Sequence, residues 1–193
     1  MRAFITPRII NMDKAFKQKI QKNNYAYIDG ANLHKGVASL GWDLDYFRFR
    51  VWLKDKYSAN QAYIFIGLIP KYKALYKYLQ EAGFTLVFKE VVYDGDGKPK
   101  GNCDAELVLQ VARDSYEQKF EKAVIVASDG DYGGLVNFLI EKGKLECVLS
   151  PAEAKKCSIL IKRTSAKISY VNDQRGLLEM SQKEKTPDED GTS

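Results

Sequence analysis

A short apolar run that ends in two aspartates constrains the fold of this chain more than any other stretch. Residues 124–127 read Val-Ile-Val-Ala, and Ser-Asp-Gly-Asp-Tyr follows at 128–132. Small and β-branched apolar residues without alternation are typical of a strand buried on both faces, as in a parallel sheet. The glycine between the aspartates allows a sharp turn into a segment with helical spacing. Acids at the carboxyl end of such a strand lie where open α/β sheets bind their ligands.

The two aspartates, Asp129 and Asp131, have a plain structural explanation and a functional one. An aspartate at this place often caps the following helix. One cap requires one acid, however, and a second acid two residues away adds like-charge repulsion unless a cation neutralises it. Both residues are therefore candidate cation ligands, with helix capping as the alternative.

The length and composition indicate one globular domain with a tail at each end. The 193 residues are 45% hydrophobic and 28% charged, as in globular proteins that bury a core. We expect a basic extension over residues 1–23, one domain over 24–180 and a disordered acidic tail over 181–193. No apolar run reaches the length of a membrane span, so no membrane partner is expected.

The net charge of +5 is concentrated at the N-terminus. Residues 1–24 carry six Lys/Arg and one acid (+6 − 1 = +5), and residues 181–193 carry two Lys and four acids (+2 − 4 = −2), which leaves +2 for residues 25–180. A nucleic-acid-binding face on the domain must therefore be built locally.

The small number of cysteines and histidines argues against a disulfide framework and against an ordinary zinc site. Cys103, Cys147 and Cys157 are odd in number and show no paired spacing, and His34 stands alone. These residues provide neither a disulfide framework nor an ordinary zinc site. We therefore expect a reducing, cytoplasmic location.

Strand and helix patterns alternate along the domain. The first strand ends at Asp29, and further strands are expected at 61–69, 84–88, 124–127 and 145–149, with a short sixth at 168–171. Helices are expected at 71–81, 104–117, 132–142 and 152–163, and a tight hairpin within 91–101. This alternation predicts an α/β fold of three layers, with a mostly parallel sheet of five to six strands and helices on both faces. We expect the strand order 3-2-1-4-5, which would place Asp29 beside Asp129 and Asp131.

A fourth carboxylate opens the helix expected at 104–117. Asp104 shares a helix face with Val108 and Val111, which should pack inward, so its charge needs a partner. An N-terminal helix cap, or an aspartate that stabilises the helix dipole, is the alternative. Four converging aspartates would form an all-oxygen site suited to Mg²⁺ or Mn²⁺. Such a site supports phosphoryl chemistry, because a bound cation activates water and stabilises charge on the reacting oxygens.

Three motifs together resemble the NYN domain family. They are Tyr-Ile-Asp-Gly-Ala-Asn-Leu at 27–33, Lys-Gly-Asn-Cys-Asp at 100–104 and Ser-Asp-Gly-Asp-Tyr at 128–132. The likeness spans about residues 24–172 and is greatest to the bacterial LabA-like branch. Because that family consists of PIN-like, metal-dependent ribonucleases, the resemblance implies a PIN-like/Rossmann-like fold. It also implies hydrolysis of RNA by a metal-activated water, leaving a 5′-phosphate.

The resemblance also implies roles for individual residues. The acidic metal-binding and catalytic set corresponds to four aspartates: Asp29, Asp104, Asp129 and Asp131. Asn32 corresponds to the asparagine near the first aspartate, which contacts substrate or supports the ligands. Ser128 corresponds to the small polar residue that could orient a water or a phosphate.

Several other side chains are weaker candidates for binding RNA. Lys98 and Lys100 lie close to Asp104 in sequence and could reach a phosphate, although a solvated loop explains them equally well. Tyr72 and Tyr76 could stack bases, but aromatic residues at that spacing are more often core. His34 is more plausibly a packing residue than a general base.

Three functions stay open at this point. The first is a metal-dependent RNA endonuclease, and the second is a non-catalytic RNA-binding or regulatory adaptor that keeps the fold. A TOPRIM-like phosphotransfer domain is the weakest, because the upstream strand of that class usually ends in glutamate and here ends in Asp29. The sequence leaves a homodimer possible.

Overall fold

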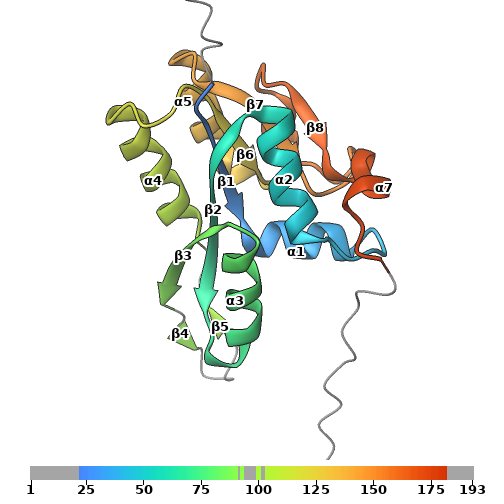
Figure 1. The fold of residues 1–193 in the computed structure, drawn as a ribbon. Helices are drawn as coiled ribbons and strands as arrows, with labels where there is room; N and C mark the ends of the chain where they lie inside the picture. Colours follow the sequence, from blue (N-terminus) through green and yellow to red (C-terminus); the bar gives the residue numbers. More distant parts are fainter. Residues whose placement is uncertain (1–21, 91, 94–98, 101–102, 182–193) are drawn as a thin grey trace, which may run out of the picture.

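The fold is shown in Figure 1 by a computed structural model, which describes residues 22–90, 92–93, 99–100 and 103–181. The predicted N-terminal extension and acidic tail lie almost wholly outside the described residues. Within these residues, no helix has both the length and the apolar character that crossing a membrane requires.

Six strands form one parallel sheet at the centre of the molecule. Every neighbouring pair is parallel. In spatial order the strands are β3 (Thr85–Glu90), β2 (Ala59–Leu68), β1 (Asn24–Asp29), β6 (Ala123–Val126), β7 (Leu145–Ser150) and β8 (Ile168–Tyr170). The order reverses between β1 and β6. The predicted α/β class and strand order are therefore confirmed, with the sixth strand added at the β7 edge.

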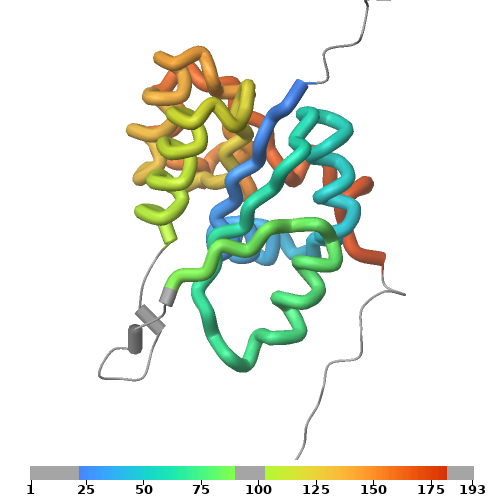
Figure 2. The backbone as a smooth tube through the Cα atoms, turned by 60° about the vertical axis from the view of Figure 1, so that its left-hand side comes forward, coloured from blue at the N-terminus to red at the C-terminus, as the bar shows by residue number. Residues whose placement is uncertain are grey.

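Helices cover both faces of the sheet, as Figure 2 shows from the side. One face carries α1 (Gly30–Ala38), α2 (Tyr46–Tyr57), α3 (Lys73–Glu81) and α7 (Arg175–Leu178). The other carries α4 (Asp104–Tyr116), α5 (Gly133–Glu141) and α6 (Ile159–Lys162). Within the described residues, three 3₁₀ turns connect these elements: η2 (Pro70–Tyr72), η3 (Gly130–Tyr132) and η4 (Val171–Gln174).

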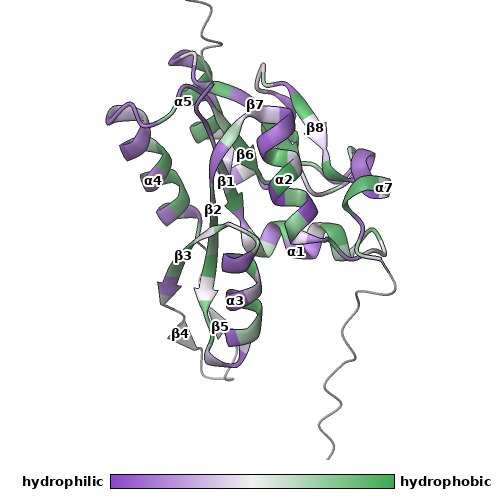
Figure 3. Cartoon of the chain, in the orientation of Figure 1, coloured by the Kyte–Doolittle hydropathy of each residue, from purple (hydrophilic) through white to green (hydrophobic). Residues whose placement is uncertain are grey.

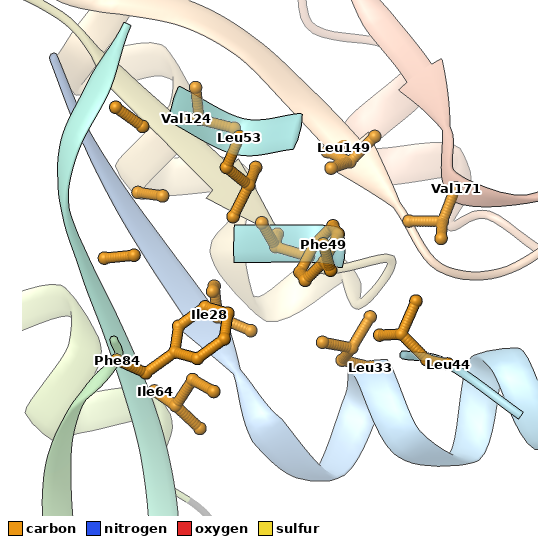
Figure 4. Packing of buried hydrophobic residues seen from close by; sticks show 14 of the residues in the cluster. Ile28, Leu33, Leu44, Phe49, Leu53, Ile64, Phe84, Val124, Leu149 and Val171 are labelled. Atoms are coloured by element: carbon orange, nitrogen blue, oxygen red, sulfur yellow. The ribbon is translucent and has the colours of Figure 1, made fainter. Parts of the chain in front are cut away.

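Alternate strand residues supply the two cores. Ile28 and Val124 point toward α2, where they pack with Phe49 and Leu53 (Figure 4). Their neighbour Tyr27 points to the other face and packs with residues of α4 and α5. Burial on both faces explains the continuous apolar runs of the central strands. In Figure 3 the helices carry both hydrophilic and hydrophobic residues, as amphipathic helices do.

One predicted helix was wrong in extent. The sequence predicted a helix over 152–163, but only Ile159–Lys162 are helical. Ser158 caps this helix, since its Oγ accepts the N–H of Leu160 at 3.2 Å, while its own N–H donates to the carbonyl of Ser128 at 3.0 Å. Because the backbone N–H of Ser158 is bonded to the turn after β6, the helix begins after Ser158 and does not include the residues before it.

The predicted hairpin near residue 95 is present in part. Strands β4 (Val92–Tyr93) and β5 (Pro99–Lys100) pair antiparallel. The turn between them lies outside the described residues.

Candidate functional site

The carboxyl ends of β1 and β6 meet where the strand order reverses. Ile28 pairs with Val126, so Asp29 lies at the level of Ala127 on the neighbouring strand. The segment 128–132 therefore begins directly beside Asp29. This is the edge at which open α/β sheets bind ligands.

Asp29 caps α1 from a buried position. Its Oδ1 accepts the backbone N–H of Asn32 at 2.9 Å, and only 8% of the residue is exposed. Burial raises the pKa of this carboxyl, and the negative charge of Asp104 adds to the rise, although hydrogen bonds from Asn32 and Tyr132 oppose it. The ionised form of Asp29 is thus disfavoured unless positive charge is placed nearby.

The next residue explains how Asp29 is held at this depth. A Cβ on Gly30 would lie 2.9 Å from Cγ2 of Ile64 and 2.9 Å from the carbonyl oxygen of Phe65. Only glycine allows the first turn of α1 to approach β2 so closely. The motif glycine after the first aspartate therefore has a packing role.

The hydroxyl of Tyr132 lies between Asp29 and Asp104. Its oxygen is 3.1 Å from Oδ2 of Asp29 and 2.6 Å from Oδ1 of Asp104, and the residue is fully buried. A phenol has one proton and donates it to one carboxylate at a time. The two carboxylates therefore share one donor, and their negative charges repel each other unless a proton or a cation is held nearby. Burial, followed by the two carboxylates, raises the pKa of Tyr132, so the phenol remains protonated.

Asp104 is the first residue of α4, and Cys103 occupies the N-cap position without a side-chain capping bond. Asp104 is therefore not the N-cap, but it lies in the first turn of α4, where its charge fits the alternative that it stabilises the helix dipole. Its carboxylate also reaches across to Tyr132 of η3. Val108 and Val111 pack in the core on this face of the sheet, which confirms the predicted inward face of α4.

Asp129 and Asp131 lie on the turn beside this pair, and both are exposed. Asp129 caps η3, because its Oδ1 accepts the N–H of Asp131 at 3.2 Å. Among the described residues, no three or more His, Cys, Asp or Glu side chains are grouped as a metal site. The structure therefore brings Asp29 and Asp104 to one hydroxyl and places the other two aspartates on the adjoining turn. The convergence of all four stays a prediction.

Asn32 and Ser128 tie α1 to the turn after β6. Oδ1 of Asn32 accepts the backbone N–H and the Oγ–H of Ser128, both at 2.9 Å. These bonds fix the start of the acidic turn relative to α1. A direct contact of either side chain with substrate stays a prediction.

The structure tests only some of the weaker candidates for binding RNA or for catalysis. Lys98 lies outside the described residues, and Lys100 is described only as part of β5. His34 is exposed on α1. Tyr76 is buried, and its hydroxyl donates to the carbonyl of Gly67 at 2.8 Å, so the core interpretation of this residue is confirmed.

Tyr132 belongs to the Ser-Asp-Gly-Asp-Tyr motif, but no role was predicted for it from the sequence. Its position directly after Asp131, at the start of a helix, was the available signal. Only the packing of η3 against α4 shows that its hydroxyl turns toward Asp29 and Asp104 rather than toward solvent.

The parallel sheet with acids at its switch point defines an α/β domain of the PIN-like type. The model of the NYN domain family matches residues 25–170, so the chain belongs to this family. A solved structure from Vibrio parahaemolyticus, of a protein of unknown function, is similar in fold, with a TM-score of 0.65 and 19% sequence identity. That similarity covers 83% of this chain and 99% of the other, and at this identity it shows the fold alone. No curated protein matches the sequence.

Proposed function

We propose that this protein is a metal-dependent endoribonuclease that hydrolyses RNA phosphodiester bonds. Asp29, Asp104, Asp129 and Asp131 would hold Mg²⁺ or Mn²⁺ at the carboxyl edge of the sheet. The observation that carries the proposal is the single Tyr132 hydroxyl between Asp29 and Asp104, beside the turn that bears the other two acids. Membership of the NYN family supports a nuclease-type fold.

The donor atoms fit a hard cation. Asp29 and Asp104 present carboxylate oxygens around one phenol hydroxyl, so a cation at this place would offset the repulsion between their negative charges. Mg²⁺ is commonly held by one or two carboxylates together with waters and substrate phosphates. Asp129 and Asp131, both exposed, would then complete the site directly or through water.

When bound, the cation would activate a water molecule and stabilise negative charge on the reacting phosphate. The residues of the chain would position these partners. Tyr132, whose raised pKa keeps it protonated, would hold the Asp104 carboxylate by a hydrogen bond rather than act as a base. Asn32 and Ser128 would fix the acidic turn against α1.

A cleavage assay tests this function. The protein is incubated with linear and circular single-stranded RNA, with Mn²⁺ or Mg²⁺, beside its Asp129→Asn variant. We expect both substrates to be cut, 5′-phosphate ends to form, and activity to be lost in EDTA or in the variant. Cutting of the circular substrate identifies endonuclease activity, because an exonuclease needs an end. Cleavage that persists in the variant or in EDTA would identify a contaminant and contradict the proposal.

An RNA-binding or regulatory adaptor is the second candidate. It is favoured by the absence, within the described part of the chain, of three grouped metal-ligating side chains. RNA binding that is independent of metal, with no turnover of any RNA tested, would support it over the nuclease.

A further inference from the structure

Strands β2 and β3 continue beyond the acidic edge. Asp29, the last residue of β1, pairs with Phe65, whereas β2 runs three residues further to Leu68 and stays paired with β3. At about 3.3 Å per residue this extension projects about 10 Å past Asp29. Figure 1 shows both strands reaching past the end of β1. A substrate bound at the aspartates would therefore lie beside this two-stranded extension.

The turn that follows β2 is exposed and basic. Residues 68–77 contain Lys71, Lys73 and Lys77 and no acid. Tyr72 is 41% exposed, and the ammonium of Lys71 lies 5.0 Å from the centroid of its ring. Within the described residues, no carboxylate forms an ion pair with Lys71 or Lys73, whereas Lys77 pairs with Glu81. The domain as a whole is nearly neutral, so this turn is a local concentration of positive charge.

Tyr76 holds this turn in place. Its hydroxyl accepts the N–H of Ile69 at 2.8 Å and donates to the carbonyl of Gly67 at 2.8 Å, so the end of β2 is fastened to α3. The ring of Tyr76 also packs edge-on against Phe88 of β3, with centroids 4.9 Å apart, and Phe88 is itself 40% exposed. The exposed ring of Tyr72 is therefore carried on a fixed support.

We infer that Lys71, Tyr72 and Lys73 form a platform that binds single-stranded RNA beside the acidic site. Tyr72 stacks on a base while the two lysines contact the phosphates that flank it. An exposed aromatic ring beside cations is the pattern by which proteins bind single strands without reading sequence. The inference rests on the proposed function, because it assigns the platform to the same RNA. A protein partner would fit exposed Leu68 and Leu75 but leaves the unpaired lysines unexplained.

Fluorescence anisotropy with a labelled 12-nucleotide single-stranded RNA tests the platform. Binding is measured in EDTA, so that no cleavage interferes. We expect Tyr72→Ala to weaken binding about 5- to 160-fold, the range that loss of one base stack gives, and Tyr72→Phe to stay within about twofold. Lys71→Ala should weaken binding and make the salt dependence shallower by about 0.7 in log–log slope. Tyr116→Ala is the matched control, because Tyr116 is 88% exposed at the far end of α4 and should have no effect.

An RNA of the same length in which the bases are replaced by abasic sites completes the test. Its binding should be insensitive to Tyr72→Ala, because no base is present to stack. Equal affinity of Tyr72→Ala and wild type for the intact RNA, or failure of Tyr72→Phe to retain affinity, would overturn the platform. So would a wild-type protein that binds no RNA. Because cleavage is assayed separately, a protein that depends on Tyr72 for binding but cuts no RNA would refute the nuclease and leave the platform standing.

Discussion

A single phenol proton serves two carboxylates at the centre of the candidate site, which makes Tyr132 the residue to test first. In Tyr132→Phe, Asp29 and Asp104 lose the hydrogen bond that this hydroxyl donates, while the ring still fills its place. Loss of a hydrogen bond to buried acceptors costs about 1–3 kcal/mol, and the free energy of unfolding should fall by that amount in metal-free protein. Urea unfolding measures it. Tyr116→Phe, which changes an exposed ring, is the control, and an equally small effect of both variants would contradict the bridging role.

The raised pKa of Asp29 predicts a particular pH dependence. Because the folded-state pKa exceeds the unfolded value of about 3.9, the native state holds this proton more tightly. The stability that Asp29 contributes is therefore fully present below about pH 3.9 and is lost as pH rises through the folded-state pKa. Asn also caps helices well, so Asp29→Asn should keep α1 and avoid this loss.

Metal-free Asp29→Asn should accordingly be more stable than wild type at neutral pH. Its advantage should shrink as the pH falls toward about 4. Urea unfolding of both proteins at several pH values between 4 and 8 measures the difference. A difference that is constant with pH would show that ionised Asp29 is not disfavoured by its burial.

At the scale of elements, the close approach of α1 to β2 sets the depth of Asp29. Gly30→Ala would place a methyl group 2.9 Å from a backbone oxygen of β2, which cannot move without disturbing the sheet. Such overpacking costs about 1–3 kcal/mol. Gly134→Ala on α5 is the matched control, because nothing lies within 4 Å of the added carbon and alanine favours the helix by up to about 1 kcal/mol. Thermal unfolding should show opposite shifts, and a stabilised Gly30→Ala would contradict the described packing.

The elements that could be predicted from sequence are those fixed by local pattern. The apolar run at 124–127 sufficed to place β6, whereas the helix that follows Asp29 was not among the predicted elements. The segment at 152–163 could not be predicted, because Ser158 is bound by the distant Ser128 carbonyl. The burial of Asp114 could not be predicted from the sequence either. This residue lies on α4 next to Arg113 in sequence, yet it is fully buried and accepts the hydroxyl of Tyr27 at 2.9 Å.

At the scale of the whole molecule, the sheet brings together side chains that are far apart in the chain. The strand order, predicted from alternating strands and helices, places β1 beside β6, and therefore Asp29 beside the 128–132 turn. What the sequence could not show is that Asp29 and Asp104 share the Tyr132 hydroxyl while Asp129 and Asp131 are exposed on the adjoining turn. That difference arises from the packing of η3 against α4, which depends on side-chain contacts between distant segments.

The most direct test of the account is the melting temperature of wild type and Asp104→Asn, each with and without Mn²⁺. Removing one of the crowded charges should raise the metal-free melting temperature, since an amide oxygen can still accept the Tyr132 proton. Wild type should gain about 5–10 °C when Mn²⁺ is present at a hundred times its dissociation constant, and the variant should gain nothing. A variant that melts lower than wild type without metal, yet keeps the full Mn²⁺ effect, would show that Asp104 takes no part in holding a cation.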